Sequence, residues 1–246
     1  VLAARDSASA DLVYMDLGVS SMQLDRRERG FSYAYDAPLD MRMDPESQVT
    51  AADLVNTLPE EELTGIFRRY GEERYARNIA RGVVRARERA PLSSTCELVE
   101  IVKRAIPTPA RFGAGNPARR VFQALRIVVN DELGELARAL FAAERALKPS
   151  GRLVVVPFHS LEDRIVKRFI ADRSENPAGS RHMPAVASKT ATFSKLGGAV
   201  APTSGEIDGN PRARSAKLRA AERTDAPPRG EDFSMFGFPK LPDLVG

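Results

Sequence analysis

Residues 11–17 read Asp11-Leu-Val-Tyr-Met-Asp-Leu17, and Gly18 follows them directly. A run that is apolar at neighbouring positions is typical of a strand buried on both faces of a parallel sheet. Glycine permits the tight turn that would end such a strand, so we expect a strand over residues 12–17. In open α/β sheets, ligands bind beyond the carboxyl ends of the strands, and Asp16 occupies that position.

The segment before this strand is short. Only ten residues of Ala, Arg, Ser and Asp character precede the apolar run, and the first residue is Val1 instead of a methionine. A strand buried on both faces needs neighbouring strands on both sides. We therefore expect the N-terminal strands of the sheet to be missing from this chain. An edge strand at a natural N-terminus, begun at a non-standard codon, is the alternative.

A second α/β segment begins near residue 122. Apolar residues recur at three- and four-residue steps from Phe122 to Leu147, which predicts one long amphipathic helix. Pro149-Ser-Gly151 would end that helix, and Leu153-Val-Val-Val-Pro-Phe158 predicts a second buried strand. Ser160-Leu-Glu-Asp163 has the pattern of a capping box at the start of a further helix. This alternation indicates a doubly wound α/β fold.

Residues 50–106 have a different character, with signals for four short helices. Thr50 precedes Asp53 by three residues, Ser94 precedes Glu97 by three, and Pro59 suits a first helical position. Strand patterns occur before and after this segment but not within it. We therefore predict an α/β domain formed by residues 1–45 and 116–246, interrupted by an inserted helical domain at residues 46–115. Beyond Asp172 no regular structure is predicted.

Composition restricts the class of protein. Lysine and arginine outnumber aspartate and glutamate by 37 to 33, and the pI near 9.4 weakly favours a polyanionic partner. One cysteine and two histidines exclude a disulfide framework and a multi-cysteine zinc site, and we expect no metal centre. No apolar run approaches the about 20 residues that span a bilayer, and no leader pattern opens the chain. We expect a soluble, cytoplasmic protein.

Two strand ends carry candidate site residues. The Asp16 carboxylate could accept hydrogen bonds from the amine or hydroxyl of a ligand, or it could cap a helix that begins near Ser20. His159, beside two acids, could take part in proton transfer, or it could pack in the core. For Ser160 and Asp163 the capping role is favoured.

Basic segments are candidates for contacts with phosphate. They are Asn116-Pro-Ala-Arg-Arg120 and Asn210-Pro-Arg-Ala-Arg-Ser-Ala-Lys-Leu-Arg219, of which the second could equally be a solvated tail. The loop at residues 26–45 interleaves aromatic residues with arginines, which would suit stacking on unpaired bases. Aromatic residues in a loop more often pack onto the core, and that reading is favoured.

Six segments together carry a resemblance to one family: Asp16-Leu-Gly-Val-Ser-Ser-Met-Gln-Leu-Asp25, Arg29-Gly-Phe-Ser32, Pro38-Leu-Asp-Met-Arg-Met-Asp44, Val121-Phe-Gln-Ala-Leu-Arg-Ile-Val-Val-Asn130, Phe158-His-Ser-Leu-Glu-Asp-Arg164 and Asn210-Pro-Arg-Ala-Arg-Ser-Ala-Lys-Leu-Arg219. From Leu12 to Arg223 the chain closely resembles the RsmH (MraW) family. The resemblance implies a bacterial enzyme that uses S-adenosyl-L-methionine to methylate N4 of a decoding-centre cytidine in 16S rRNA of the small ribosomal subunit. It also implies a Rossmann-like class I methyltransferase sheet with an inserted all-α domain.

The resemblance assigns roles to individual residues. Asp16 and Gln23 match family residues that contact S-adenosyl-L-methionine, and Asp16 and His159 are the candidate catalytic residues. The family's glycine-rich turn has no counterpart here, because it would precede Val1, and Phe112-Gly-Ala-Gly115 does not replace it. We therefore expect the truncated chain to be inactive alone. The candidate RNA-binding residues are Arg29, Phe31, Arg119, Arg120, Arg212, Arg214, Lys217 and Arg219.

Other readings remain open. Asn116 stands where the family usually has a histidine, and an asparagine cannot titrate. A non-catalytic RNA-binding fragment of such an enzyme would carry the same basic segments. A nicotinamide-dependent dehydrogenase would share the fold class, but no G-x-G-x-x-G follows a strand here. A homodimer is compatible with the sequence.

Overall fold

The computed structural model describes residues 9–20, 23, 26–108, 116–174 and 190–237. These residues form two compact units. The sheet unit contains the described residues up to Gly18 and those from Leu133 onward, and the helical unit runs from Val19 to Glu132. No helix in the described ranges has both the length and the apolar character needed to cross a lipid bilayer.

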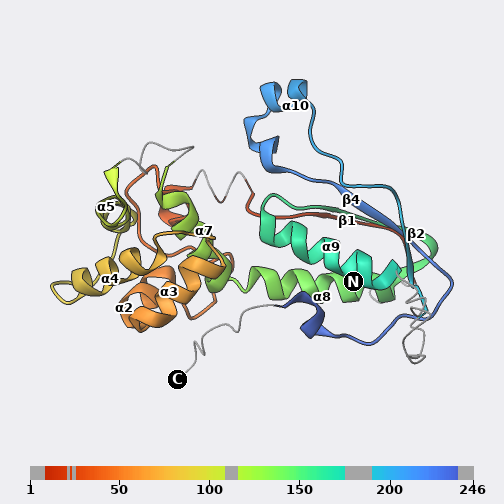
Figure 1. Cartoon of the computed structure of the whole chain (residues 1–246), viewed down its shortest axis with the longest axis horizontal. Helices are drawn as coiled ribbons and strands as arrows, with labels where there is room; N and C mark the ends of the chain where they lie inside the picture. The colour runs from red at the N-terminus through yellow and green to blue at the C-terminus, as the bar shows by residue number, and fades with distance from the viewer. Residues whose placement is uncertain (1–8, 21–22, 24–25, 109–115, 175–189, 238–246) are drawn as a thin grey trace, which may run out of the picture. The chain divides into compact units, whose positions relative to one another are not determined.

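In the described residues, the sheet unit has four strands in the order β1-β2-β4-β3. Figure 1 labels β1, β2 and β4 of this sheet. The four strands are β1 (Ala10–Asp16), β2 (Leu147–Val156), β4 (Arg219–Arg223) and β3 (Phe193–Lys195). β1 pairs with β2 in parallel, whereas β4 is antiparallel to both β2 and β3. The two predicted strands are confirmed, and the α/β class with them. β3 and β4 lie in the region for which the sequence predicted no regular structure.

β1 is less buried than its sequence predicts. Among the described strands it lies at one edge of the sheet, with β2 as its neighbour. Leu12 is 55% exposed and Tyr14 is 58% exposed, and no residue of β1 is fully buried. The expectation of a strand buried on both faces is therefore wrong in this structure. β2, at an inner position, does bury Leu153 and Val155 completely.

Helices α8 (Glu132–Ala146) and α9 (Ser160–Ser174) supply the apolar core of the sheet unit. Phe169 of α9 packs edge-on against Phe141 of α8, with ring centroids 5.9 Å apart, and against Phe193 of β3 at 5.8 Å. Short elements complete the unit: α10 (Ser204–Gly209), η3 (Pro211–Ser215) and η4 (Phe233–Phe236). Phe233 and Phe236 of η4 also contact the Phe141 ring.

The helical unit contains the four predicted short helices. They are α2 (Ala51–Thr57), α3 (Glu60–Arg69), α4 (Ala76–Arg87) and α5 (Thr95–Ala105). The capping boxes of Thr50 with Asp53 and of Ser94 with Glu97 are both formed, so these helix starts are confirmed. The unit also contains η2 (Arg27–Arg29) and α7 (Ala118–Val129).

The boundaries of the helical unit differ from the predicted 46–115. The loop at residues 26–45 belongs to this unit because its backbone pairs with the start of α5. Leu39 N donates to Ser93 O at 3.0 Å, and Thr95 N donates to Ala37 O at 2.9 Å. Helix α7 joins the same unit by packing against α2, α3 and α5. These residues are therefore not part of the sheet unit.

The long helix predicted from Phe122 to Leu147 is divided into α7 and α8. Asp131 has a positive φ of 45°, a conformation that interrupts an α-helix and that Asp tolerates better than most residues. The side chain of Asn130 holds the break: its amide nitrogen donates to Met41 O at 2.8 Å, and its oxygen accepts from Met43 N at 2.6 Å. The prediction of one helix was wrong because apolar periodicity continues through a break that distant residues stabilise.

Candidate functional site

The carboxyl ends of β1 and β2 lie side by side. Asp16 is in register with Val156, the last residue of β2, and Leu17 N donates to Val156 O at 3.1 Å. The segment Phe158–Arg164 begins two residues beyond that register. Both predicted motifs therefore meet at one edge of the sheet, as expected for parallel strands. We call this place the β1/β2 edge.

Asp16 is exposed at the β1/β2 edge. Within the described part of the chain, its side chain makes no hydrogen bond or ion pair. Gly18 has a φ of 94°, and a Cβ there would have no atom within 4 Å, so the space beside the turn is open. An exposed carboxylate next to an open backbone turn can accept hydrogen bonds from the hydroxyl or amine of a ligand.

A local cap is formed by Ser20 and Gln23 instead of Asp16. Ser20 N donates to Gln23 Oε1 at 2.8 Å, and Gln23 N donates to Ser20 Oγ at 3.3 Å. These reciprocal bonds have the pattern of a capping box. The alternative in which Asp16 serves as the helix cap is therefore not what the structure shows. Ser21, the last residue of the turn, lies outside the described residues.

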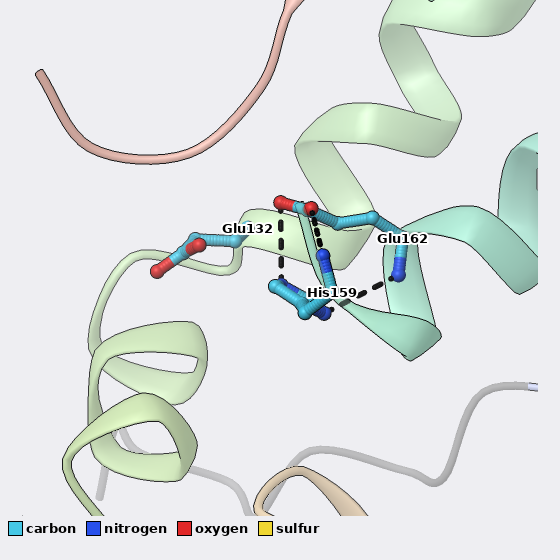
Figure 2. Close-up of side chains that lie close together, drawn as sticks. All are labelled: Glu132, His159 and Glu162. Carbon is cyan, nitrogen blue, oxygen red and sulfur yellow. Dashed lines mark hydrogen bonds and ion pairs between the residues drawn. The ribbon is translucent and has the colours of Figure 1, made fainter. Parts of the chain in front are cut away.

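His159 and Glu162 form a close pair at the start of α9 (Figure 2). Glu162 Oε2 accepts from Phe158 N at 2.8 Å and from His159 N at 3.2 Å, while His159 Nδ1 accepts from Glu162 N at 3.4 Å. Together these bonds form a capping box in which histidine replaces the usual serine. His159 Nε2 lies 3.2 Å from Glu162 Oε1 and makes no hydrogen bond with the described residues.

This pairing bears on the role of His159. Its side chain is 12% exposed, and that of Glu162 is 4% exposed. Because Nδ1 accepts a backbone hydrogen bond, the nitrogen that carries a lone pair faces the protein's own helix. The geometry thus favours a positioning role over proton transfer from a substrate. Glu132, also drawn in Figure 2, accepts two hydrogen bonds from Arg126 at 2.7 and 2.9 Å.

The predicted capping pair of Ser160 and Asp163 is wrong by one residue. Helix α9 begins at Ser160, so His159 occupies the N-cap position and Glu162 is the third helical residue. Ser160 is exposed. Asp163 instead contacts the Arg-rich segment near the end of the chain.

Asp163 binds Lys217 and Arg219 of that segment at the β1/β2 edge. Its carboxylate accepts from Arg219 Nε at 2.7 Å and from Lys217 Nζ at 3.1 Å, and Lys217 N donates to Pro157 O at 3.0 Å. Burial acts to raise the pKa of Asp163, but the hydrogen bonds and charges of Arg219 and Lys217 outweigh it and lower the pKa. Lys217 and Arg219 therefore have partners within the protein.

Five of the candidate RNA-binding residues are exposed: Arg119, Arg120, Arg212, Arg214 and Lys217. In the sheet unit, Arg212 and Arg214 lie in η3, where Asn210 Oδ1 caps the turn by accepting from Arg212 N at 3.2 Å. In the helical unit, Arg120 Nη1 donates to Glu72 O at 3.2 Å. These exposed arginines can contact phosphate.

Arg29 and Phe31 are used within the loop itself. Phe31 is 7% exposed, and the Arg29 guanidinium lies 5.9 Å from its ring centroid. Arg29 Nη2 also donates to Arg42 O at 2.7 Å and to Met43 O at 2.9 Å. Core packing, the favoured reading for the aromatic residues, is confirmed for Phe31. Tyr35, by contrast, is 45% exposed and carries Arg27 over its ring at 4.3 Å.

Sequence reasoning missed two groups of polar residues. Glu162 was passed over because Ser160 and Asp163 matched the capping pattern first. Arg81 and Arg85 of α4, and Arg89 just after its end, were also missed, although their four-residue spacing could have identified them.

Comparisons with known proteins agree on one family. The model of the MraW methylase family matches residues 1–224. A relative from Mesorhizobium japonicum, named Ribosomal RNA small subunit methyltransferase H, is 59% identical over 236 residues, which cover 96% of this chain and 69% of that protein. Relatives of the same name from Brucella canis and Brucella suis are each 55% identical over 234 residues, covering 95% of this chain and 67% of theirs. The fold, the motifs at the β1/β2 edge and these matches together show that the chain belongs to the MraW methylase family.

Proposed function

We propose that this chain, as part of the full-length enzyme, serves the methylation of N4 of a decoding-centre cytidine in 16S rRNA of the small ribosomal subunit, with S-adenosyl-L-methionine as the methyl donor. The observation that carries the proposal is the exposed Asp16 at the β1/β2 edge, beside the end of the parallel strand β2. Membership of a methylase family supports methyl transfer, and the names of the relatives support ribosomal RNA as the substrate. Such a substrate would place the enzyme in the bacterial cytoplasm.

The residues at the β1/β2 edge fit part of the donor. Asp16 offers a carboxylate with no partner among the described residues, and the turn at Gly18 leaves open space beside it. Asp16 would accept hydrogen bonds from hydroxyl or amine groups of the bound donor. The resemblance also assigns Gln23, in the helical unit, to the donor; its Oε1 accepts from Ser20 N, and its amide nitrogen can donate. When bound, the sulfonium donor supplies an electrophilic methyl group.

The protein's part in the reaction is to position the target amine. The lone pair of the cytosine amine is delocalised into the ring, which makes it a poor nucleophile. Holding it in line with the methyl group and accepting hydrogen bonds from its protons lowers the barrier. The target base must also be unpaired or extruded from folded RNA. Many amine methyltransferases carry an Asp/Asn/Ser-Pro-Pro-aromatic turn at this position, where this chain has Asp16-Leu-Gly-Val19.

Exposed arginines would hold the RNA. Arg212 and Arg214 in η3 have guanidinium groups at the surface, which suits contacts with phosphate oxygens. Charge reversal at both positions should weaken RNA binding and flatten its dependence on salt concentration. An unchanged salt slope would remove η3 from the RNA interface.

The decisive experiment replaces Asp16. In the full-length enzyme, we expect Asp16→Ala to abolish methyl transfer to small ribosomal subunits while leaving the melting temperature unchanged, because its side chain has no partner among the described residues. Asp11→Ala is the matched control: it removes an equally exposed acid of β1 whose partner is Lys148 at the surface. Mass spectrometry of the digested RNA identifies the methylated nucleoside. Near-normal turnover by Asp16→Ala, or methylation at another base, would contradict the proposal.

A second candidate is an RNA-binding protein without methyl transfer. The exposed arginines of both units favour it, since they would bind RNA whether or not the β1/β2 edge binds a donor. Calorimetry with S-adenosylhomocysteine separates the two functions. Affinity for this product that Asp16→Ala removes supports the methyltransferase, whereas RNA binding without any such affinity supports the second candidate.

A further inference from the structure

Helices α4 and α5 enclose a groove of about 480 Å³ within the helical unit. The two helices approach closely at Gly82, where a Cβ would lie only 3.0 Å from Ile101 Cγ2 of α5. Gly82 and Ile101 therefore form the floor of the groove. Arg81, Arg85 and Arg89 line one side, and Arg104 of α5 lies on the other. We call this feature the α4/α5 arginine groove.

The charge of the groove is almost uncompensated. No acidic side chain is among its described lining residues. Arg81 lies 3.8 Å from Glu60, but both side chains are substantially exposed, so water screens this pair. In the described ranges, Arg85 and Arg89 make no side-chain hydrogen bond or ion pair, and Arg104 acts on Glu100 only through its charge.

Arg87 of α4 has a structural role, which distinguishes it from the groove arginines. Arg87 Nη1 donates to Val55 O and to Leu58 O, each at 2.8 Å, and so ties α4 to α2. The groove arginines make no such bonds to backbone carbonyls. Like charges four residues apart on a helix repel one another. Arg81 and Arg85 have this spacing within α4, and Arg89 follows in the turn after the helix, so the repulsion between these charges favours a bound anion.

We propose that the α4/α5 arginine groove binds the phosphodiester backbone of RNA. Guanidinium groups match phosphate oxygens in geometry and charge, and Arg81 and Arg85 are about 6 Å apart along the axis of α4. No aromatic side chain is among the described residues that line the groove, so it offers no surface for stacking bases. The groove thus positions the RNA without reading its sequence. The choice of RNA as the ligand of this groove rests on the proposed function.

The test compares two double variants of the whole chain. Arg85→Gln with Arg89→Gln removes two charges from the groove, and Arg68→Gln with Arg77→Gln removes two exposed helical arginines outside it. The binding of the wild type and of each double variant to 16S rRNA is measured over a range of salt concentrations. We expect the groove variant to raise Kd on the order of tenfold and to lower the slope of log K against log salt by about 1.5, because two phosphate contacts are lost. The control should retain the wild-type slope.

The outcome can be separated from that of the proposed function. Affinity for S-adenosylhomocysteine depends on the β1/β2 edge, so we expect it to be unchanged in the groove variant. The slope comparison needs only RNA binding and remains informative if no methyl transfer is found. Equal slopes for the two double variants, with both folded by circular dichroism, would overturn the role of the groove.

Discussion

The carboxylate of Glu144 in α8 accepts a hydrogen bond from Arg173 Nε of α9 at 2.9 Å, and both side chains are only 1% exposed. The second carboxylate oxygen accepts from Thr192 Oγ1 at 2.6 Å, and Arg173 Nη2 donates to Gly230 O at 2.9 Å. A buried ion pair is tolerated only when its remaining polar atoms are also bonded. These contacts join α8, α9 and the chain after β4.

Glu144→Ala should strongly destabilise the sheet unit, because it leaves the buried Arg173 with the partly exposed Asp172 as its remaining acidic partner and removes the acceptor of Thr192 Oγ1. We expect the free energy of unfolding to fall by about 3–5 kcal/mol, measured by urea denaturation. Glu135→Ala is the control on the same helix: its ion pair with Arg138 is exposed, and the expected loss is below about 1 kcal/mol. Similar losses for the two variants would show that the buried pair adds no stability.

Asp163 should make the stability of the sheet unit depend on acid pH. Hydrogen bonds from Arg219 and Lys217 hold its pKa below the ordinary 3.8 in the folded protein. A lowered pKa contributes stability above the unfolded value, and that contribution is lost as pH falls below about 4. Urea denaturation should therefore find Asp163→Asn less stable than wild type at pH 7, with the difference shrinking towards pH 3.

The control for this prediction is Asp208→Asn in α10. Asp208 is exposed and makes no side-chain contact with the described residues. We expect this variant to track the wild type at every pH. A stability difference for Asp163→Asn that stays constant from pH 7 to pH 3 would contradict the linkage to its ionisation.

Local signals in the sequence predicted the helix starts of the helical unit. A capping box is completed within four residues, so the pairs that begin at Thr50 and Ser94 could be recognised without the fold. The same pattern at Ser160 was misleading, because histidine is not a usual N-cap residue and the competing pair looked better. The common edge of β1 and β2 followed from the rule for parallel strands, which needs no side-chain detail.

Contacts between distant residues account for what the sequence did not predict. The break at Asn130 depends on Met41 and Met43, which lie 89 and 87 residues earlier. β4 reads Arg219-Ala-Ala-Glu-Arg223 and lacks the β-branched residues that mark strands, so its pairing with β2 sets its conformation. The pairing of β4 with β2 brings Arg219 to Asp163, which lies 56 residues earlier in the chain.

Gly30→Ala should destabilise the helical unit through the backbone. Gly30 has a φ of 68°, and a Cβ there would lie 2.2 Å from Pro38 O. Since the obstacle is backbone, we expect the free energy of unfolding to fall by more than about 1 kcal/mol. Gly65→Ala is the opposite case, in α3 with no atom within 4 Å of a Cβ, and should gain about 0.4–1 kcal/mol. Thermal denaturation that shifts both variants in the same direction would rule out this account.

Replacement of His159 by asparagine separates a capping role from proton transfer. Asparagine is among the best N-cap residues and can accept from Glu162 N as the imidazole does, but it cannot titrate. If His159 only positions the start of α9, then His159→Asn keeps wild-type stability, turnover and pH profile, whereas His159→Ala loses about 1 kcal/mol of stability. Turnover of His159→Asn as low as that of His159→Ala, at wild-type stability, would assign the imidazole a part in the reaction, because the cap would then be intact while its titrating group is gone.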